Sequence, residues 1–225
     1  MAATGQQEPA SERVRVRRLP ARGRYDRDTV AAILDEALIC HVGIVEDGQP
    51  YVIPTIHSRI GDRLVLHGST GSRTLRGLME GGPVCVTATV LDGLVMARSG
   101  FHHSMNYRSV MVLGTARPVT DEDRRMEALR AVVEHVVPGR WDEIRPPSAK
   151  ELSATLLVEV DLDEASAKVR TGPPIDGEED MDLKVWAGVL PLRMMPLEPV
   201  PDPALRVSVD VPPSVARWTR GGQPR

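Results

Sequence analysis

The chain has 225 residues, of which 41% are hydrophobic, and this is enough apolar material for one large domain with a real core rather than a disordered chain. The formal net charge is -3, and the aromatic residues are three Trp, three Tyr and one Phe. The sequence therefore supplies neither the positive charge nor the stacking rings that nucleic-acid binding needs, and we predict no nucleic-acid partner.

Residues 1–24 are polar and rich in arginine, without a hydrophobic period. The run RVRVRR (13–18) lacks the apolar segment of a secretory signal, and no later stretch approaches the roughly 18 consecutive apolar residues of a membrane span. Cys40 and Cys85 both lie in apolar runs, where buried free thiols are the common outcome. We expect an N-terminal arm over 1–24, no membrane partner and a cytoplasmic protein.

The first element after the arm is a helix over 27–38, because Val30, Ile33, Leu34 and Leu38 recur at helical spacing after Asp28 or Thr29 as N-cap. Apolar runs rich in β-formers follow, separated by the turn signals Asp47-Gly48 and Gly61-Asp62. Glycine supplies the positive φ that tight hairpins demand. This part of the chain predicts an antiparallel meander.

The second half of the chain alternates strands and helices. We expect a helix over 72–80, closed by Gly81-Gly82-Pro83, and three further strands from 84–99 and 107–119. The segment 120–136 has acidic residues in its first turn and an apolar stripe, and it predicts a second long helix. The segment 154–169 predicts one last long strand.

These elements predict a mainly β fold with peripheral helices, of the α+β class, built as a small barrel rather than a Rossmann sheet. The segment after residue 172 is rich in proline and acidic residues and has only short apolar patches. We therefore divide the chain into an arm (1–24), a barrel domain (25–172) and a wrapping C-terminal extension (173–225).

The stretch HGSTGSRTLRGL (67–78) passes from the end of a strand into the start of a helix. A helix start exposes N–H groups and favours an anion, and Ser69, Thr70, Ser72 and Thr74 add hydroxyl groups beside Arg73. The stretch matches neither a Walker loop nor G-x-G-x-x-G. The stretch is therefore either a phosphate-binding turn or a helix start with a well-satisfied N-cap.

The segments YVIPTIHSRIGDRLVLHGSTGSRTLRGLMEGGPVCVTATV (51–90) and NYRSVMVLGTARPV (106–119) resemble the core of the pyridoxamine 5'-phosphate oxidase-like FMN-binding split barrels. The similarity is greatest to their nitroimidazole-reductase-like, flavin-nucleotide-binding branch, and it covers roughly residues 14–192. The resemblance implies a six-stranded antiparallel split β-barrel with FMN as cofactor, bound at a homodimer interface.

The resemblance also implies which residues hold the flavin. It sets three β-strand residues against the ring, a strand end at the ring edge, a turn at the phosphate, and two residues of a neighbouring strand beside the flavin. A tryptophan in the C-terminal extension would reach the flavin of the partner subunit, so the resemblance implies that the extension 173–225 contributes to the dimer and to the flavin site. Pro54, Thr55 and Ile56 are the strand residues against the ring, and His67, Gly68 and Ser69 lie at the ring edge. Ser72, Arg73 and Thr74 form the turn at the phosphate. Arg108 and Ser109 are the two residues of the neighbouring strand, and Trp186 is the tryptophan of the extension. His67 is the candidate catalytic residue.

The implied function is that of an FMN-dependent oxidoreductase that acts on a small organic molecule, with NAD(P)H or a deazaflavin as electron donor. In such proteins the flavin performs the redox chemistry and the protein orients it. Two alternatives remain: a non-catalytic flavin-binding or storage protein, and a haem-binding split barrel with a histidine ligand. His102 and His103 are adjacent and would face opposite sides of a strand, while His57 and His67 lack short ligand spacing, so we predict no metal site.

Overall fold

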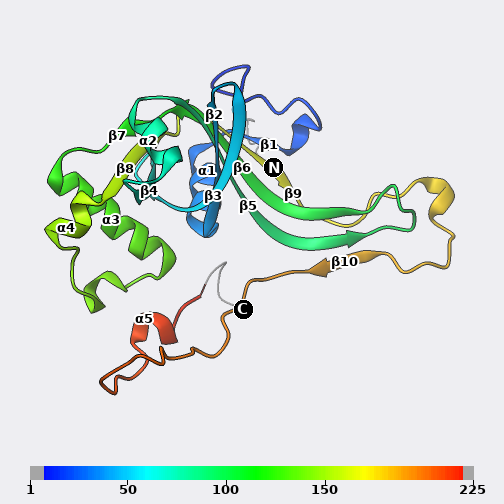
Figure 1. The fold of residues 1–225 in the computed structure, drawn as a ribbon. Helices are drawn as coiled ribbons and strands as arrows, with labels where there is room; N and C mark the ends of the chain where they lie inside the picture. The colour runs from blue at the N-terminus through cyan, green and yellow to red at the C-terminus, as the bar shows by residue number, and fades with distance from the viewer. Residues whose placement is uncertain (1–7, 220–225) are drawn as a thin grey trace.

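The computed structural model describes residues 8–219, so the first seven residues of the predicted arm and the last six of the predicted extension lie outside the described part. Ten strands form one antiparallel sheet in the order β1-β9-β6-β5-β2-β3-β4-β8-β7, with β10 beside β5 (Figure 1). The strands are β1 Gly23–Arg24, β2 Ile39–Glu46, β3 Gln49–Ile60, β4 Arg63–Ser69, β5 Pro83–Met96, β6 Ser104–Thr115, β7 Arg117–Pro118, β8 Thr155–Asp161, β9 Glu164–Arg170 and β10 Gly188–Pro191.

Among residues 8–219, five α-helices and three short 3₁₀ turns lie outside the strand ladder (Figure 1). They are α1 Arg27–Glu36, α2 Arg73–Met79, α3 Glu122–Val136, α4 Ala149–Ser153 and α5 Pro213–Ala216, with η1 Pro20–Arg22, η2 Trp141–Glu143 and η3 Glu178–Asp180. No helix among residues 8–219 is long and apolar enough to cross a membrane.

The predicted meander is confirmed as β2, β3 and β4. Asp47 and Gly48 both have positive φ, 50° and 77°, which is the backbone of the two-residue turn that matches strand twist. The turn fixes the register, pairing Glu46 with Gln49 and Ile39 with Ile56. Because side chains alternate across a strand, this register decides which residues of β2 and β3 face inward.

The core lies on the inner face of this sheet. Cys40, Val42 and Ile44 alternate inward from β2, and α1 presents its apolar side to them through Ile33 and Leu34, each at most 1% exposed. A second, smaller cluster under α3 contains Val65, Val119, Ala128, Val132 and Leu157. Full burial of each large apolar side chain stabilises the fold by about 1.5–3 kcal/mol.

Two details of the sequence interpretation were wrong. The segment 154–169 is not one strand but the hairpin β8–β9, whose turn lies at Leu162, where the backbone N–H donates to Asp62 (3.0 Å). This division, with the short strands β1, β7 and β10, gives ten strands where six were expected. The cap of α1 is Asp26, whose side chain accepts from Thr29 N at 2.8 Å, rather than Asp28 or Thr29.

Candidate functional site

The barrel is open between β3 and β4. β3 pairs with β2 along its first eight residues, 49–56, but it pairs with β4 only from His57 to Ile60. β4 pairs with β8 along its whole length. The facing edges of β3 (49–56) and β4 (67–69) therefore have no strand ladder between them, and we call this opening the split.

Nine of the twelve predicted site residues lie on the elements that border the split. β3 contributes three from its unpaired edge, the end of β4 contributes three, and the cap and first turn of α2 contribute three. These residues are Pro54, Thr55, Ile56, His67, Gly68, Ser69, Ser72, Arg73 and Thr74.

His67 is half-buried at the edge of β4, where it pairs across the ladder with Leu157. Its Nδ1 is fully buried and has no hydrogen-bond partner within residues 8–219. Burial lowers the pKa of His67, because a charged imidazolium loses hydration there, so the ring is neutral at pH 7. Its Nδ1 is thus a buried polar atom whose partner is not supplied by the described chain, as expected where a cofactor binds.

The turn from β4 into α2 is tight. A Cβ on Gly68 would lie 3.2 Å from Leu75 Cγ and 3.6 Å from Ser72 Cβ, so glycine lets the first turn of the helix approach the strand. Ser72 caps the helix by accepting from Leu75 N at 3.3 Å, and its own N–H donates to Ser69 O at 2.9 Å. The N–H groups of Arg73 and Thr74 belong to the first turn, which no helix carbonyl can accept.

Arg73 stands at the mouth of the split. Its guanidinium carbon lies 4.2 Å above the ring of Tyr51 on β3, and its Nε is 3.1 Å from Glu46 Oε2 at the end of β2. The side chain is 53% exposed. Arg73 therefore presents part of its five-donor fork to solvent at the start of α2.

Glu46 and Tyr51 are site residues that the sequence interpretation missed. The turn at Asp47-Gly48 was recognised, and the hairpin register that it implies already places Tyr51 opposite Ile44, two pairs from the turn. What the sequence did not reveal is that α2 would return to this hairpin and bring Arg73 onto both side chains.

Arg108 and Ser109 lie on β6, which β5 and β2 separate from β3 in the sheet. Arg108 forms a tight ion pair with Glu36 of α1 and donates to both oxygens of Asp92, at 2.9 and 2.7 Å. Hydrogen bonds to Glu36 and then to Asp92 raise the pKa of Arg108. Ser109 Oγ donates to Lys168 O at 3.4 Å. Arg108 joins α1, β5 and β6 and is not at the split of its own chain.

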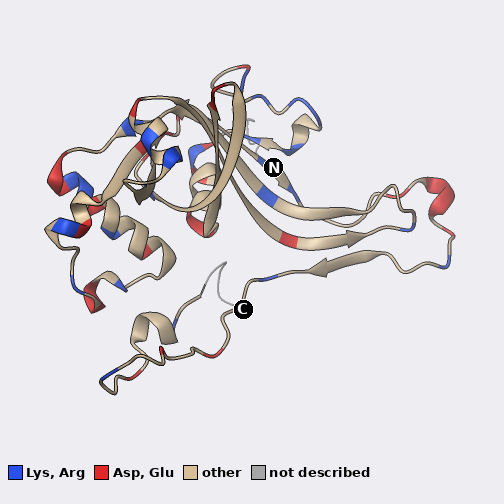
Figure 2. Cartoon of the chain, in the orientation of Figure 1, with Lys and Arg blue, Asp and Glu red and all other residues tan. Residues whose placement is uncertain are grey.

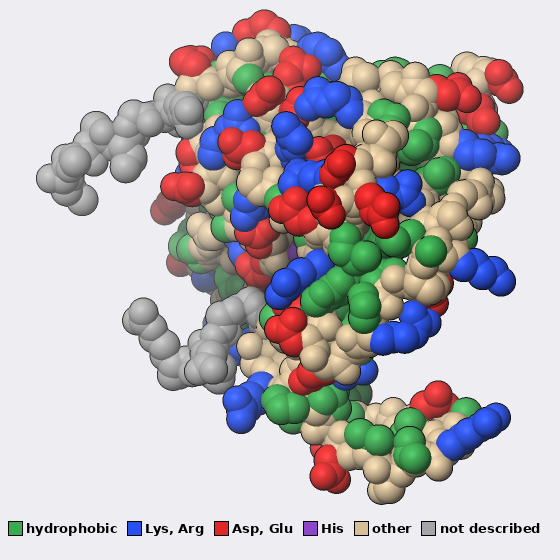
Figure 3. Space-filling model, turned by 90° about the vertical axis from the view of Figure 1, so that its left-hand side faces the viewer, with side chains coloured by type: hydrophobic (Ala, Val, Ile, Leu, Met, Phe, Trp, Pro, Cys, Tyr) green, Lys and Arg blue, Asp and Glu red, His purple; other side chains and the backbone are tan. Residues whose placement is uncertain are grey.

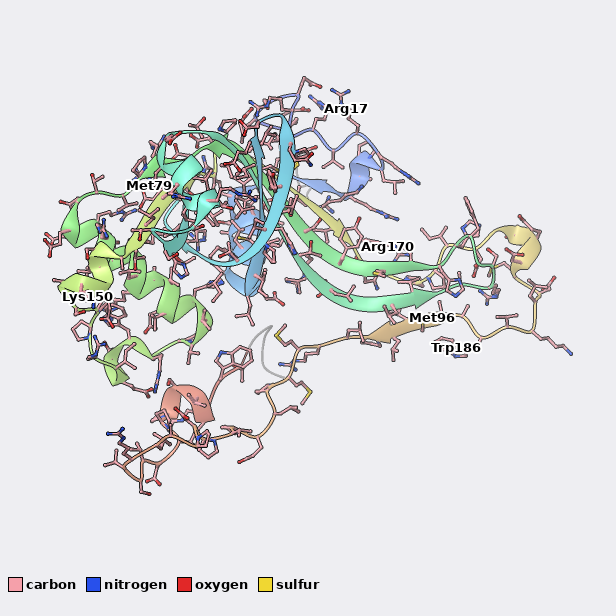
Figure 4. The ribbon with its side chains drawn as sticks, in the orientation of Figure 1. Arg17, Met79, Met96, Lys150, Arg170 and Trp186 are labelled. Carbon is pink, nitrogen blue, oxygen red and sulfur yellow. The ribbon has the colours of Figure 1, made fainter. Side chains whose placement is uncertain are left out.

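Trp186 lies far from the split. It is 69% exposed, and its ring lies so close to Gly188 that a Cβ there would be 3.0 Å from Trp186 Cζ2. Figure 4 shows Trp186 beside Met96 at the outer end of the β5–β6 ribbon, across the molecule from Met79 of α2. The fold does not bring Trp186 to the flavin residues of its own chain.

The sequence of this barrel matches a known family model. Residues 26–169 fit the model described as pyridoxamine 5'-phosphate oxidase. The chain belongs to this family. No protein with a curated description matches the sequence. Residues 8–219 contain no group of three or more His, Cys, Asp or Glu side chains placed to hold a metal ion, and the expectation of no metal site stays a prediction.

Several solved structures share the family fold. The flavocytochrome Anf3 from Azotobacter vinelandii is 43% identical, with 96% of this chain and 100% of that one covered and a TM-score of 0.89. The FAD and haem binding protein from Mycobacterium smegmatis is 39% identical, with 87% and 96% covered and a TM-score of 0.83. A protein from Bacteroides thetaiotaomicron named for 5-nitroimidazole antibiotic resistance is 24% identical, with 65% and 86% covered and a TM-score of 0.56, and it shares the fold.

Proposed function

We propose that the chain binds a flavin nucleotide in the split, with its phosphate at the start of α2 and its ring system between β3 and β4. The observation that carries the proposal is Arg73, whose side chain is 53% exposed at the first residue of α2. Charged hydrogen bonds from arginine are the common means of holding phosphate. The relatives from A. vinelandii and M. smegmatis are named as a flavocytochrome and an FAD and haem binding protein, which supports a flavin here.

FMN is our first choice of flavin, and the same residues suit FAD, because FAD contains the ring and first phosphate of FMN. When bound, the flavin supplies hydride and electron transfer. The chain supplies the position: Arg73 holds the phosphate, Ile56 keeps water from one edge, and the neutral imidazole of His67 offers a site that can hold a proton beside the ring. Thr55 precedes Ile56 on the same segment of β3.

We further propose that this is a flavin-dependent oxidoreductase of the cytoplasm, acting on a small organic molecule with NAD(P)H or a deazaflavin as donor. We also propose a homodimer. Trp186, which the family resemblance sets at the flavin of the partner subunit, lies away from the split of its own chain. A second copy is the natural source of any such contact.

A second function, haem binding, is favoured by His67. Its ring is neutral, and Nε2 makes no hydrogen bond within the described chain and is not buried, which suits a ligand that gives a lone pair to iron. The names of the two relatives above also include a cytochrome and a haem. In this proposal His67 would hold the haem iron, and the chain would be a flavin- and haem-containing redox protein.

The flavin proposal is tested by titrating the purified protein with FMN and with FAD and following flavin fluorescence. We expect Arg73→Ala to raise the dissociation constant about tenfold or more, because a charged phosphate contact is lost. Arg76→Ala is the matched control, since Arg76 is exposed on the same helix. Equal affinity in the wild type and Arg73→Ala would remove the phosphate from this site, and no retention of either flavin would end the flavin proposal.

The haem proposal is tested by adding haemin and recording the Soret band. His67→Ala should lose the band of ligated haem, while His103→Ala, a change at an exposed histidine, should keep it. An unchanged spectrum in His67→Ala would assign the ligand elsewhere. Failure of the wild type to take up haem would leave the flavin proposal standing alone.

A further inference from the structure

The N-terminal arm gathers positive charge that the rest of the chain does not neutralise. Residues 13–24 contain six arginines and no acidic residue (Figure 2), although the whole chain has a net charge of -3. Two of these arginines are paired, since Arg13 lies 3.2 Å from Glu164 and Arg15 lies 2.7 Å from Glu12. The other four form no ion pair within the described chain, and they are Arg17, Arg18, Arg22 and Arg24.

The carboxylates missing from the arm are not left over elsewhere in the sequence. Residues 1–7 and 220–225, which lie outside the described part, contain no Asp or Glu. On the side of α3 and α4, by contrast, positive and negative side chains are interspersed (Figure 3), and Arg117, Arg124 and Arg145 each pair with an acidic residue. A second molecule is therefore the natural source of carboxylates for the arm.

The neighbouring strand adds positive charge instead of cancelling it. The turn η1 of the arm packs against β9, whose last residue is Arg170. Arg170 is 5% exposed, and its hydrogen bonds go to one amide oxygen and two backbone carbonyl oxygens, all uncharged. Burial, and then the charge of Arg22, lower the pKa of Arg170. This edge of the sheet is thus electropositive both at the surface and beneath it.

Leu19 follows two of these arginines and has a strained backbone. Its φ and ψ are 56° and 62°, in the left-handed region that a leucine rarely adopts. Its side chain is nevertheless 47% exposed, so burial in the core does not explain the strain. Strained backbone is commonly found where a protein contacts a ligand or a partner. We call Arg17, Arg18, Leu19 and Arg22 the basic loop.

The arm holds this loop in place with contacts of its own. Val14 is 1% exposed and fixes the arm to the body of the protein. Val16 N donates to Tyr25 Oη at 2.8 Å, which ties the two sides of the loop together. Arg22 N donates to Leu19 O at 3.0 Å and closes η1 directly after the strained residue. A loop that is ordered before binding loses little conformational entropy when a partner docks.

We propose that the basic loop is a docking surface for an acidic segment of another protein, whose carboxylates pair with the arginines and whose apolar side chain packs on Leu19. The guanidinium group binds a carboxylate through two parallel hydrogen bonds, which favours this partner. Arginines around a central apolar contact are also a common composition of protein interfaces. The proposal does not depend on flavin or haem, because no residue of the basic loop belongs to the split.

Two other polyanions fit the basic loop less well. Residues 13–24 contain no aromatic ring on which a nucleic-acid base could stack, and the acidic residues Glu8, Glu12 and Asp26 flank the arm and would repel a long polyanion. A lipid surface would need several apolar side chains to enter it, and Leu19 is the one large exposed hydrophobic residue of this segment. An acidic protein segment needs only a local match of charge.

The experiment titrates the full chain into a fluorescein-labelled peptide, Glu-Glu-Asp-Leu-Glu-Glu-Asp, and follows fluorescence anisotropy. We expect the wild type to bind it and to ignore the same peptide with Gln and Asn in place of the acids. Arg17→Gln together with Arg18→Gln should weaken binding about tenfold or more. The control, Arg145→Gln with Arg206→Gln, removes the same charge from two exposed arginines outside the arm and should change it little. No binding by the wild type, or equal losses in the two double variants, would overturn the proposal.

Leu19→Gly separates the contact from the fold. Glycine adopts the left-handed region without strain, so the free energy of unfolding in urea should not fall, while peptide binding should weaken about threefold or more. Unchanged binding in this variant would contradict the role of Leu19. Vesicles of equal parts phosphatidylcholine and phosphatidylserine, and oligothymidine, are tested in the same way. Tighter binding to either of these than to the peptide, lost with Arg17→Gln and Arg18→Gln, would overturn the proposal and assign the basic loop to that polyanion.

Discussion

The two ends of β4 differ in how completely the chain satisfies its own residues. At the start of β4, Leu64 and Leu66 are fully buried, and the neighbouring Glu159 of β8, 5% exposed, is held by Arg63 at 2.9 Å and Arg124 at 2.7 Å. At its other end, His67 has a buried ring nitrogen without a partner in residues 8–219, and Arg73 beyond it is half exposed. At the start of β4 the charged side chains are paired within the fold. At the split, polar groups of His67 and Arg73 remain available to a ligand.

The two arginines expected beside the flavin make the same contrast. Arg108 is bound by two carboxylates and Arg73 by one carboxylate and one ring. An arginine already shared between two carboxylates has little attraction left for a phosphate, since the pair outweighs its positive charge. Residue type alone therefore does not identify an anion site, and the ion pairs that the arginine already makes decide it.

The largest effect should come from filling the closed part of the barrel. A Cβ on Gly114 of β6 would lie 2.8 Å from Val160 Cγ1, so Gly114→Ala forces β6 and β8 apart. We expect a loss of about 2–3 kcal/mol in the free energy of unfolding, measured in urea. Gly77→Ala, at an exposed helix position with nothing within 4 Å, is the control and should not destabilise. Equal free energies of unfolding in the two variants would show that β6 and β8 can move apart without a loss of stability.

Arg108→Met should come next, with a loss of about 2 kcal/mol, because Glu36 and Asp92 are left half-buried without their partner. Flavin affinity should stay the same at a temperature where the variant is folded. Arg145→Met, which removes an exposed ion pair with Glu151, should cost less than about 1 kcal/mol. A large loss of flavin affinity in Arg108→Met would break the contrast between the two arginines.

Glu46→Gln tests whether the carboxylate that pairs with Arg73 competes with the flavin phosphate. The change frees Arg73 from its carboxylate, so flavin affinity should rise about threefold, equivalent to ~0.6 kcal/mol. The measurement is the same fluorescence titration. Glu80→Gln removes the same charge from the exposed end of α2, away from this ion pair, and should leave affinity nearly unchanged. Weaker binding in Glu46→Gln would mean that Glu46 orients Arg73 rather than competing with the phosphate.

The smallest effect concerns pH. Burial lowers the pKa of His67 below its ordinary 6.5, so the unfolded chain takes up a proton first as pH falls. Stability without ligand should be complete above about pH 6.5 and decline as pH falls through the folded pKa. His67→Leu should remove this part of the decline, while His103→Leu should keep it. NMR titration of the ring would contradict the idea if His67 titrated above 6.5.

The local features of the fold were predictable from the sequence, and the pairings between distant segments were not. Asp47-Gly48 and Gly61 mark their turns because positive φ is a property of single residues. The turn at Leu162 carries no glycine or proline, so β8 and β9 were read as one strand. The tie between Arg108 and Glu36 joins residues 72 positions apart, and only the folded sheet brings them together.

The same distinction holds for the candidate site. The passage from strand to helix around Gly68 and Ser72 was evident from residue types, and the structure places it as expected at the end of β4. The position of Trp186 at the far end of a ribbon depends on how β10 joins β5, which no local pattern in the sequence reveals. The part of a site built from consecutive residues is therefore the part that a single sequence predicts best.

The joining of β10 to β5 also bears on how a shortened protein would behave. β10 pairs from Gly188–Met96 to Pro191–Gly93, and Gly93 allows the close approach, since a Cβ there would lie 3.0 Å from Leu190 O. A chain cut back to the family-matched residues 26–169 would leave this edge of β5 with bare N–H and C=O groups beside apolar side chains. Such an edge adds strands from other molecules, so β10 protects the protein from aggregation.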